Sequence, residues 1–106
     1  MPVSPQEQEL VDRWTSYLEV DKGRSPQTVS KYAQYIGRLA SWLANPPAEK
    51  QLAPTGSRNL VTVTPEDLRV FAGIWAHKQG LSAAARMPLI SAIRNFYAWF
   101  AKHGNG

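Results

Sequence analysis

The sequence predicts an all-α fold: a compact domain of four helices with one long irregular loop between the second and the third. Three segments start with the same helix signature, a Ser or Thr followed by Pro: Ser4-Pro5, Ser25-Pro26 and Thr64-Pro65. A Ser or Thr N-cap accepts a backbone N–H, and Pro is tolerated at the first helical position because that N–H has no intrahelical partner. Apolar residues recur every three or four positions in the stretches that follow, which is typical of amphipathic helices. We expect one domain over residues 1–106, with helices over about 5–21, 26–44, 65–79 and 82–102.

The first two helices are predicted from their apolar stripes and their ends. Glu7 follows Ser4 by three residues and would complete a capping box, and Gly23 would end the first helix as a C-terminal cap. The first stripe consists of Leu10, Val11, Trp14, Tyr17 and Leu18. The second consists of Val29, Tyr32, Ile36, Leu39, Ala40 and Leu43. Asn45-Pro46-Pro47 stops the second helix.

Residues 45–63 form the long connection, which Pro46, Pro47, Pro54 and Gly56 keep irregular. An irregular connection of this length is unusual in a compact domain. We expect its end to be attached to the core by three apolar residues: Leu60, Val61 and Val63.

The last two helices follow this connection. Glu66 and Asp67 suit the positive end of the third helix dipole. The third stripe consists of Leu68, Phe71, Ala72 and Trp75, widened by Val70 and Ile74, and the fourth of Ile90, Ile93, Phe96, Tyr97 and Phe100. Pro88 lies deep enough in the fourth helix to cost about 3 kcal/mol in a straight helix. It predicts a kink, or a short first turn over 82–86 followed by the main helix.

Charge divides the chain unevenly. The first 21 residues hold five acids and one Arg, whereas the remainder holds three acids, Glu49, Glu66 and Asp67, against eleven Lys and Arg. The net charge of +4 therefore combines a negative front with a strongly positive remainder. Residues 22–48 and 68–106 contain no acid at all. A helix face with bases and no acids suits a polyanion, and nucleic acid is the polyanion that Lys and Arg bind by neutralising phosphates.

The candidate DNA-binding residues are the polar and basic side chains that the apolar stripes leave outside. Backbone N–H groups at a helix start, flanked by hydroxyls and bases, form a phosphate site. Arg and Gln can also read base edges. The candidates are Lys22, Arg24, Ser25, Thr28, Lys31, Gln34 and Arg38 around the second helix, and Ser82, Arg86, Ser91 and Arg94 on the fourth, where Asn95 and Lys102 share the polar face.

Several other functions are disfavoured. The chain has no Cys and two His, His77 and His103, with no linking motif, so we expect no metal site, no cofactor and no catalytic residue. It lacks the pattern of a signal peptide, and no apolar run approaches the roughly 18 residues of a membrane span. We expect a soluble protein of the cytoplasm, associated with the nucleoid, and no membrane partner.

Residues 14–104 resemble the N-terminal core-binding domain of tyrosine recombinases, the phage-integrase family. The resemblance is carried by Trp14, Tyr17-Leu18, Lys22-Gly23, Thr28-Val29, Tyr32, Trp42-Leu43, Val63-Thr64-Pro65-Glu66-Asp67-Leu68, Gly80-Leu81-Ser82 and the block Ser91-Ala92-Ile93-Arg94-Asn95-Phe96-Tyr97-Ala98-Trp99-Phe100. It implies a SAM-like domain that holds one side of duplex DNA while a catalytic domain holds the other. Carried over, Thr28 and Lys31, together with Ser82, Arg86 and Arg94, would serve the DNA.

The same resemblance implies further partners. The catalytic Arg, Lys, His-x-x-Arg and Tyr of the family would belong to a domain after Gly106. The isolated domain is expected to be monomeric and to bind weakly, and the full-length protein to act as a tetramer on DNA. At Pro88 and Leu89 the family often has basic residues, so this chain departs from the pattern there.

Two alternatives remain. One is a helical protein-interaction module without DNA binding, which would use Trp99, Tyr35 and the acidic first helix. The other is a helix-turn-helix regulator, although the last two helices lack its short turn and recognition-helix spacing.

Overall fold

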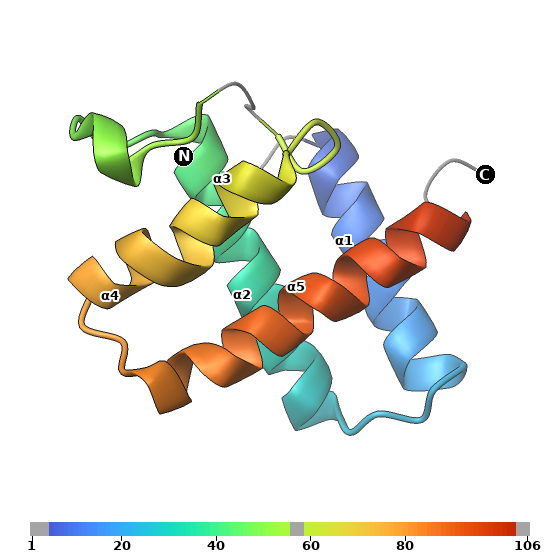
Figure 1. The fold of residues 1–106 in the computed structure, drawn as a ribbon. Coiled ribbons are helices and arrows are strands. Elements are labelled where there is room, and N and C mark those ends of the chain that lie inside the picture. The colour runs from blue at the N-terminus through green and yellow to red at the C-terminus, as the bar shows by residue number, and fades with distance from the viewer. Residues whose placement is uncertain (1–4, 56–58, 104–106) are drawn as a thin grey trace.

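The computed structural model describes residues 5–55 and 59–103, and these contain helices and no strand. The elements are α1 (Pro5–Val20), α2 (Pro26–Ala44), the 3-10 turn η1 (Lys50–Leu52), α3 (Pro65–Val70), the π-helical segment η2 (Phe71–Trp75), α4 (Ala76–Lys78) and α5 (Ala83–His103). Because α3, η2 and α4 follow one another without a break, the chain has four main helical segments (Figure 1). The predicted all-α, four-helix fold is confirmed.

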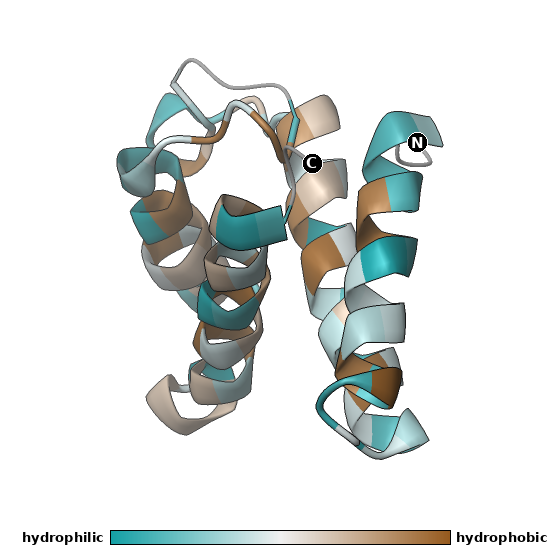
Figure 2. Ribbon diagram, turned by 90° about the vertical axis from the view of Figure 1, so that its right-hand side faces the viewer, coloured by the Kyte–Doolittle hydropathy of each residue, from teal (hydrophilic) through white to brown (hydrophobic). Residues whose placement is uncertain are grey.

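α2 occupies the centre of the fold and packs against both α1 and α5, and α5 also packs against η2. Figure 1 shows α5 crossing in front of α2. The indole of Trp14 links the three helices: it stacks on the ring of Tyr32 at 6.1 Å and meets the ring of Phe96 edge-on at 5.2 Å. In Figure 2 hydrophobic and hydrophilic segments alternate along the helices, as amphipathic helices require.

The helix ends follow the predicted cap signatures. The side-chain oxygens of three N-cap residues accept the backbone N–H three positions on: Ser25 from Thr28, Thr64 from Asp67, and Ser82 from Ala85. Gly23 has a φ of 63°, a left-handed conformation that suits the predicted C-terminal cap of α1. Ser4, the other predicted N-cap, lies outside the described residues.

The π-helical segment corrects the predicted stripe of the third helix. The N–H of Ala76 donates to the carbonyl of Phe71, five residues back, as well as to that of Gly73. This wider turn rotates the following side chains, so Ala76 is fully buried and Ile74 is 53% exposed. The prediction that Ile74 widens the apolar stripe is wrong, because it assumed the regular helical period.

Pro88 lies inside α5, which runs without interruption from Ala83 to His103 and is drawn as one helix in Figure 1. The predicted separate first turn over 82–86 is therefore wrong. Pro88 is exposed, whereas Leu89, Ile93 and Phe96 just beyond it are buried in the core. This packing holds the segment helical although Pro88 offers no N–H to the preceding turn.

The long connection is held by side-chain hydrogen bonds as well as by buried apolar residues such as Leu52 and Leu60. The Glu7 carboxylate, 5% exposed, accepts the N–H of Leu60 at 3.0 Å, and the Tyr97 hydroxyl donates to the Leu60 carbonyl at 2.8 Å. Burial raises the pKa of the Tyr97 hydroxyl, and the nearby Glu7 carboxylate raises it further. Leu60 is buried as predicted, but Val61 is 52% exposed, so its predicted attachment to the core is wrong.

Asp67 ties the middle of the same connection to the start of α3. Its carboxylate is fully buried and accepts both the N–H of Thr55, at 2.8 Å, and the Thr55 hydroxyl, at 3.1 Å. The indole N–H of Trp42 donates to the carbonyl of Leu52 at 2.9 Å. Glu7 and Asp67 are thus buried acceptors that join segments distant in sequence.

Candidate nucleic-acid interface

Seven of the predicted DNA-binding residues lie on α2 or on the connection before it. All except the half-buried Thr28 are exposed: Lys22, Arg24, Ser25, Lys31, Gln34 and Arg38. The Ser25 and Thr28 hydroxyls lie 3.0 Å apart, and the Ser25 oxygen caps α2. These two hydroxyls stand at a helix N-terminus between neighbouring bases, which is the arrangement that a phosphate site uses.

The fold brings the start of α2 next to the end of α5. Lys22 and Arg24 line one hollow of about 260 Å³ together with Lys102 and His103 of α5. We call this the basic hollow. The Lys22 ammonium lies 5.8 Å from the centre of the Tyr17 ring, which is a cation–π distance. Lys102 was not among the principal candidates, although the acid-free stretch over 68–106 includes it.

The outer face of α2 carries the remaining candidates of this helix in two places. Lys31 and Gln34 line a shallow depression along the N-terminal half. Arg38 lies towards the other end, beside Trp75 and Pro47. Arg38 therefore lies in different surroundings from Lys22 and Arg24, which line the basic hollow, although all three residues belong to one acid-free stretch.

On α5, Ser82, Ser91 and Arg94 are exposed, and Ser82 also caps the helix. Asn95 has a structural partner instead, since its side-chain oxygen accepts the indole N–H of Trp14 at 2.9 Å. Sequence patterns alone cannot reveal this bond, because the two residues are 81 positions apart.

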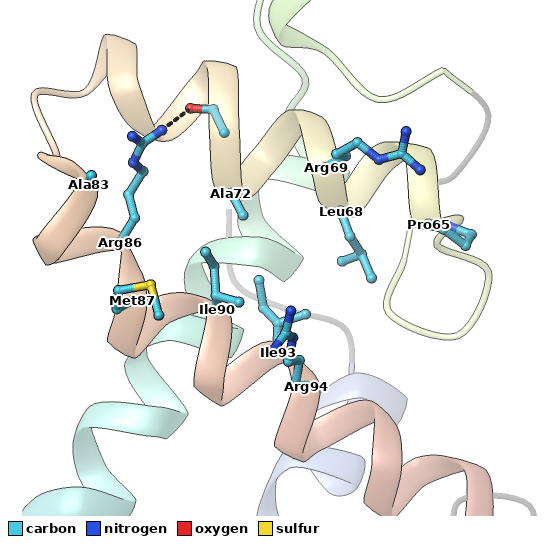
Figure 3. Close-up of a pocket in the computed structure, with 11 residues that line it drawn as sticks. Pro65, Leu68, Arg69, Ala72, Ala83, Arg86, Met87, Ile90, Ile93 and Arg94 are labelled. Atoms are coloured by element: carbon cyan, nitrogen blue, oxygen red, sulfur yellow. Dashed lines mark hydrogen bonds between the residues drawn. The ribbon is translucent and has the colours of Figure 1, made fainter.

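Arg86 and Arg94 lie at a second surface, a groove between α3–η2 and α5 (Figure 3). The guanidinium of Arg86 reaches across it and donates to the Gly73 carbonyl at 3.3 Å. Arg69 also lines this groove, and the sequence reasoning missed it. We call the space the arginine groove; its apolar lining includes Leu68, Ala72, Met87, Ile90 and Ile93.

Most bases at these surfaces form no ion pair with an acid among the described residues. No ion pair between two described residues involves Lys22, Arg24, Lys31, Arg86 or Arg94. Arg69 does pair with Glu66, at 3.4 Å, but both side chains are largely exposed, and such pairs stabilise little. The charge of the two surfaces is therefore available to a ligand.

The surface proposed for the alternative protein-interaction module is only partly present. Trp99 is 6% exposed, packs on Phe96 and lies under the Arg13 guanidinium, whose carbon is 5.6 Å from the ring centre. Tyr35 is half-buried against the core. Trp99 is therefore not an exposed docking residue, as this alternative would require, because the apolar face of α5 is wider than its main stripe.

Within residues 5–55 and 59–103, no group of three or more His, Asp or Glu could hold a metal ion. None of the helices in the described part of the chain is long and apolar enough to cross a membrane.

Comparison with known proteins gives one consistent family. The model of the family described as "Phage integrase, N-terminal SAM-like domain" matches residues 11–104. The chain is similar to Tyrosine recombinase XerC of Xylella fastidiosa (strain 9a5c), with 31% identity over 96 residues that cover 91% of this chain and 29% of the relative. It is also similar to Tyrosine recombinase XerC of Oceanobacillus iheyensis, with 28% identity covering 89% and 28%. The chain thus spans less than a third of these relatives, and no solved structure matches it significantly.

Proposed function

The chain belongs to the phage integrase N-terminal SAM-like domain family, and from this premise we propose that it is a DNA-binding domain of a site-specific tyrosine recombinase. In this proposal it holds one side of a duplex at the recombination site through α2 and α5. It performs no catalytic step itself. Cleavage and rejoining belong to a catalytic domain of the same recombinase, which acts in the cytoplasm as a tetramer on nucleoid DNA.

One observation carries the proposal. Lys22 and Arg24 meet Lys102 in the basic hollow, although these residues are about 80 positions apart in the chain. No ion pair between described residues uses any of the three. A cluster of unpaired bases near a capped helix N-terminus supports phosphate binding, and the acid-free outer face of α2 extends the positive surface along Lys31.

Different side chains would position the protein on the duplex and recognise its bases. Ser25, Thr28 and the bases of the hollow suit phosphates, which fix the register of a protein on the duplex. Gln34, Arg38 and Arg94 have the donor geometry for base edges. Half of the proposed clamp is supplied by another domain, so we expect weak binding by this chain alone, with a dissociation constant in the micromolar range or above at physiological salt.

The test is a fluorescence-anisotropy titration of a labelled duplex at several salt concentrations. The logarithm of the affinity should fall linearly with the logarithm of the salt concentration, by about 0.9 per phosphate contacted. Lys22→Glu with Lys31→Glu should flatten this slope by about 1.8 and lower the affinity roughly 50-fold at low salt.

The matched control is Lys50→Glu with Lys78→Glu. Both lysines are exposed and lie outside the basic hollow, the outer face of α2 and the arginine groove, yet the net charge changes equally. If the control variant loses as much affinity as the test variant, the chain is attracted to DNA only by its net charge. Absence of DNA binding at low salt would refute the proposal.

A further inference from the structure

The arginine groove has an apolar floor that the DNA-binding proposal does not use, although Arg86 and Arg94 on its border are also candidate DNA-binding residues. Its floor is apolar and lies between two helices: in Figure 3 Leu68 reaches down from α3, and Ile90 reaches up from α5. Met87 stands in this floor with 59% of its surface exposed. An exposed apolar surface bordered by polar groups marks an interaction site, and Met is common on surfaces that adapt to a partner.

The border of the groove is positive. Three arginines line it, Arg69, Arg86 and Arg94, and no acid does. The Glu66 carboxylate lies 3.4 Å from the Arg69 guanidinium, and both side chains are largely exposed. Arg86 uses one donor on the Gly73 carbonyl and keeps its other N–H groups for a ligand. The groove therefore combines apolar burial with recognition of carboxylates.

We propose that the arginine groove docks an acidic amphipathic helix of a partner protein. A helix laid between two others contributes apolar anchors at spacings of three and four to the floor and carboxylates to the border. With a volume of about 690 Å³ the groove accommodates several such anchors. Duplex DNA is disfavoured as the occupant, because phosphates and sugars would cover Met87 and Ile90 without giving them apolar contacts.

A second copy of this chain is also disfavoured. Its acidic helix, α1, would supply carboxylates, but the apolar side chains Leu10, Trp14 and Leu18 are buried in its own core. Val20 is the one large apolar residue that α1 exposes, with 80% of its surface accessible. One exposed Val cannot fill a floor built from five apolar side chains.

The test uses methyl NMR of the chain with labelled Met, Ile and Leu. The probe is a synthetic helix of about 18 residues, or five turns, with Leu on one face and Glu beside it. One control peptide has Lys in place of every Glu, and another has Ser in place of every Leu. We expect the Glu peptide to shift the methyl signals of Met87, Ile90 and Leu68 saturably, and both control peptides to bind at least tenfold more weakly.

Two exposed residues give matched variants. Met87→Ser should weaken the Glu peptide about tenfold, whereas Ile74→Ser, at a similarly exposed apolar position outside the groove, should leave it unchanged. Arg69→Gln, at a residue not proposed to contact DNA, should reduce the preference for Glu over Lys peptides. The proposal is overturned if millimolar Glu peptide does not shift the methyl signals, or if the Lys peptide binds equally well. It is also overturned if duplex DNA shifts the Met87 and Ile90 methyl signals and the Glu peptide does not.

Discussion

The crossing of α2 and α5 and the connection over residues 45–63 are stabilised by different forces. At the crossing, Leu39 of α2 and Phe96 of α5 are fully buried among other apolar side chains. The connection depends on polar contacts, in which Glu7, Asp67 and Tyr97 bind its backbone. Since most of the proposed DNA-binding residues stand on α2 and α5, we expect the apolar crossing to orient them more than the connection does.

Burial of acids also contributes to the positive surface of the domain. Two of the eight acids, Glu7 and Asp67, are buried and accept backbone hydrogen bonds. After residue 21 the chain has three acids, and none of them lies on α2 or α5. One of the three, Asp67, is buried and binds Thr55, so it does not offset the positive charge at the surface. The surface of the domain is therefore more positive than the acid count alone suggests.

The largest effect is expected at the crossing, from Phe96→Ala. Phe96 is fully buried and contacts the rings of Trp14, Tyr97 and Trp99, so its removal leaves a cavity and should lower the free energy of unfolding by about 3–5 kcal/mol. Urea unfolding followed by circular dichroism measures this. DNA binding should be lost in proportion to the unfolded fraction, and a folded variant that binds no DNA would contradict the view that the crossing acts through orientation alone.

A smaller effect is expected in the connection, from Asp67→Ala. It removes the acceptor of the Thr55 N–H and hydroxyl, and we expect the free energy of unfolding to fall by about 2 kcal/mol. Glu66→Ala is the matched control, because Glu66 is the adjacent acid and is exposed. Hydrogen exchange should show lost protection near Thr55 while α2 and α5 stay protected.

The salt slope of DNA binding extends this test. We expect it to be the same in Asp67→Ala as in the unaltered chain, since Asp67 binds Thr55 and is not one of the proposed DNA contacts. A changed slope would show that the two regions are coupled.

Local signals in the sequence predicted most of the fold. Ser25 and Thr64 cap their helices as expected, because an N-cap bond spans three residues and depends on nothing distant, and Ser82 caps α5 in the same way. The π-helical turn at Phe71–Trp75 and the passage of α5 through Pro88 were not predictable from the same signals. Both depend on which side chains the neighbouring helices bury.

Contacts between distant residues explain what the sequence could not predict about the candidate site. Lys102 joins Lys22 and Arg24 only through the fold. Arg69 shares the arginine groove with Arg86 and Arg94 only because η2, which follows α3, packs against α5. The sequence pattern of α5 does not decide whether Asn95 and Trp99 face the core or the solvent. The bond to Trp14 and the burial of Trp99 assign both to the fold.

The smallest effect is expected from Tyr97→Phe, which removes a single hydrogen bond of the connection. The hydroxyl donates to the Leu60 carbonyl at 2.8 Å, so its loss at neutral pH should lower the free energy of unfolding by about 1 kcal/mol. The ring still fits its place against Phe96 and Phe100. Urea unfolding at pH 7 measures the difference.

Alkaline pH separates the hydroxyl from the ring. The pKa of Tyr97 in the folded state is raised above its ordinary value of 10.0 by burial and by Glu7, so the unfolded chain releases this proton first. The contribution of Tyr97 to stability is complete below pH 10 and is lost as pH rises towards the folded-state pKa. Tyr97→Phe should therefore lose less stability between pH 9 and about pH 11 than the unaltered chain. If both proteins lose the same stability over this pH range, the Tyr97 hydroxyl is not held by the Leu60 carbonyl. The polar contacts of the connection would then contribute less to stability than we propose.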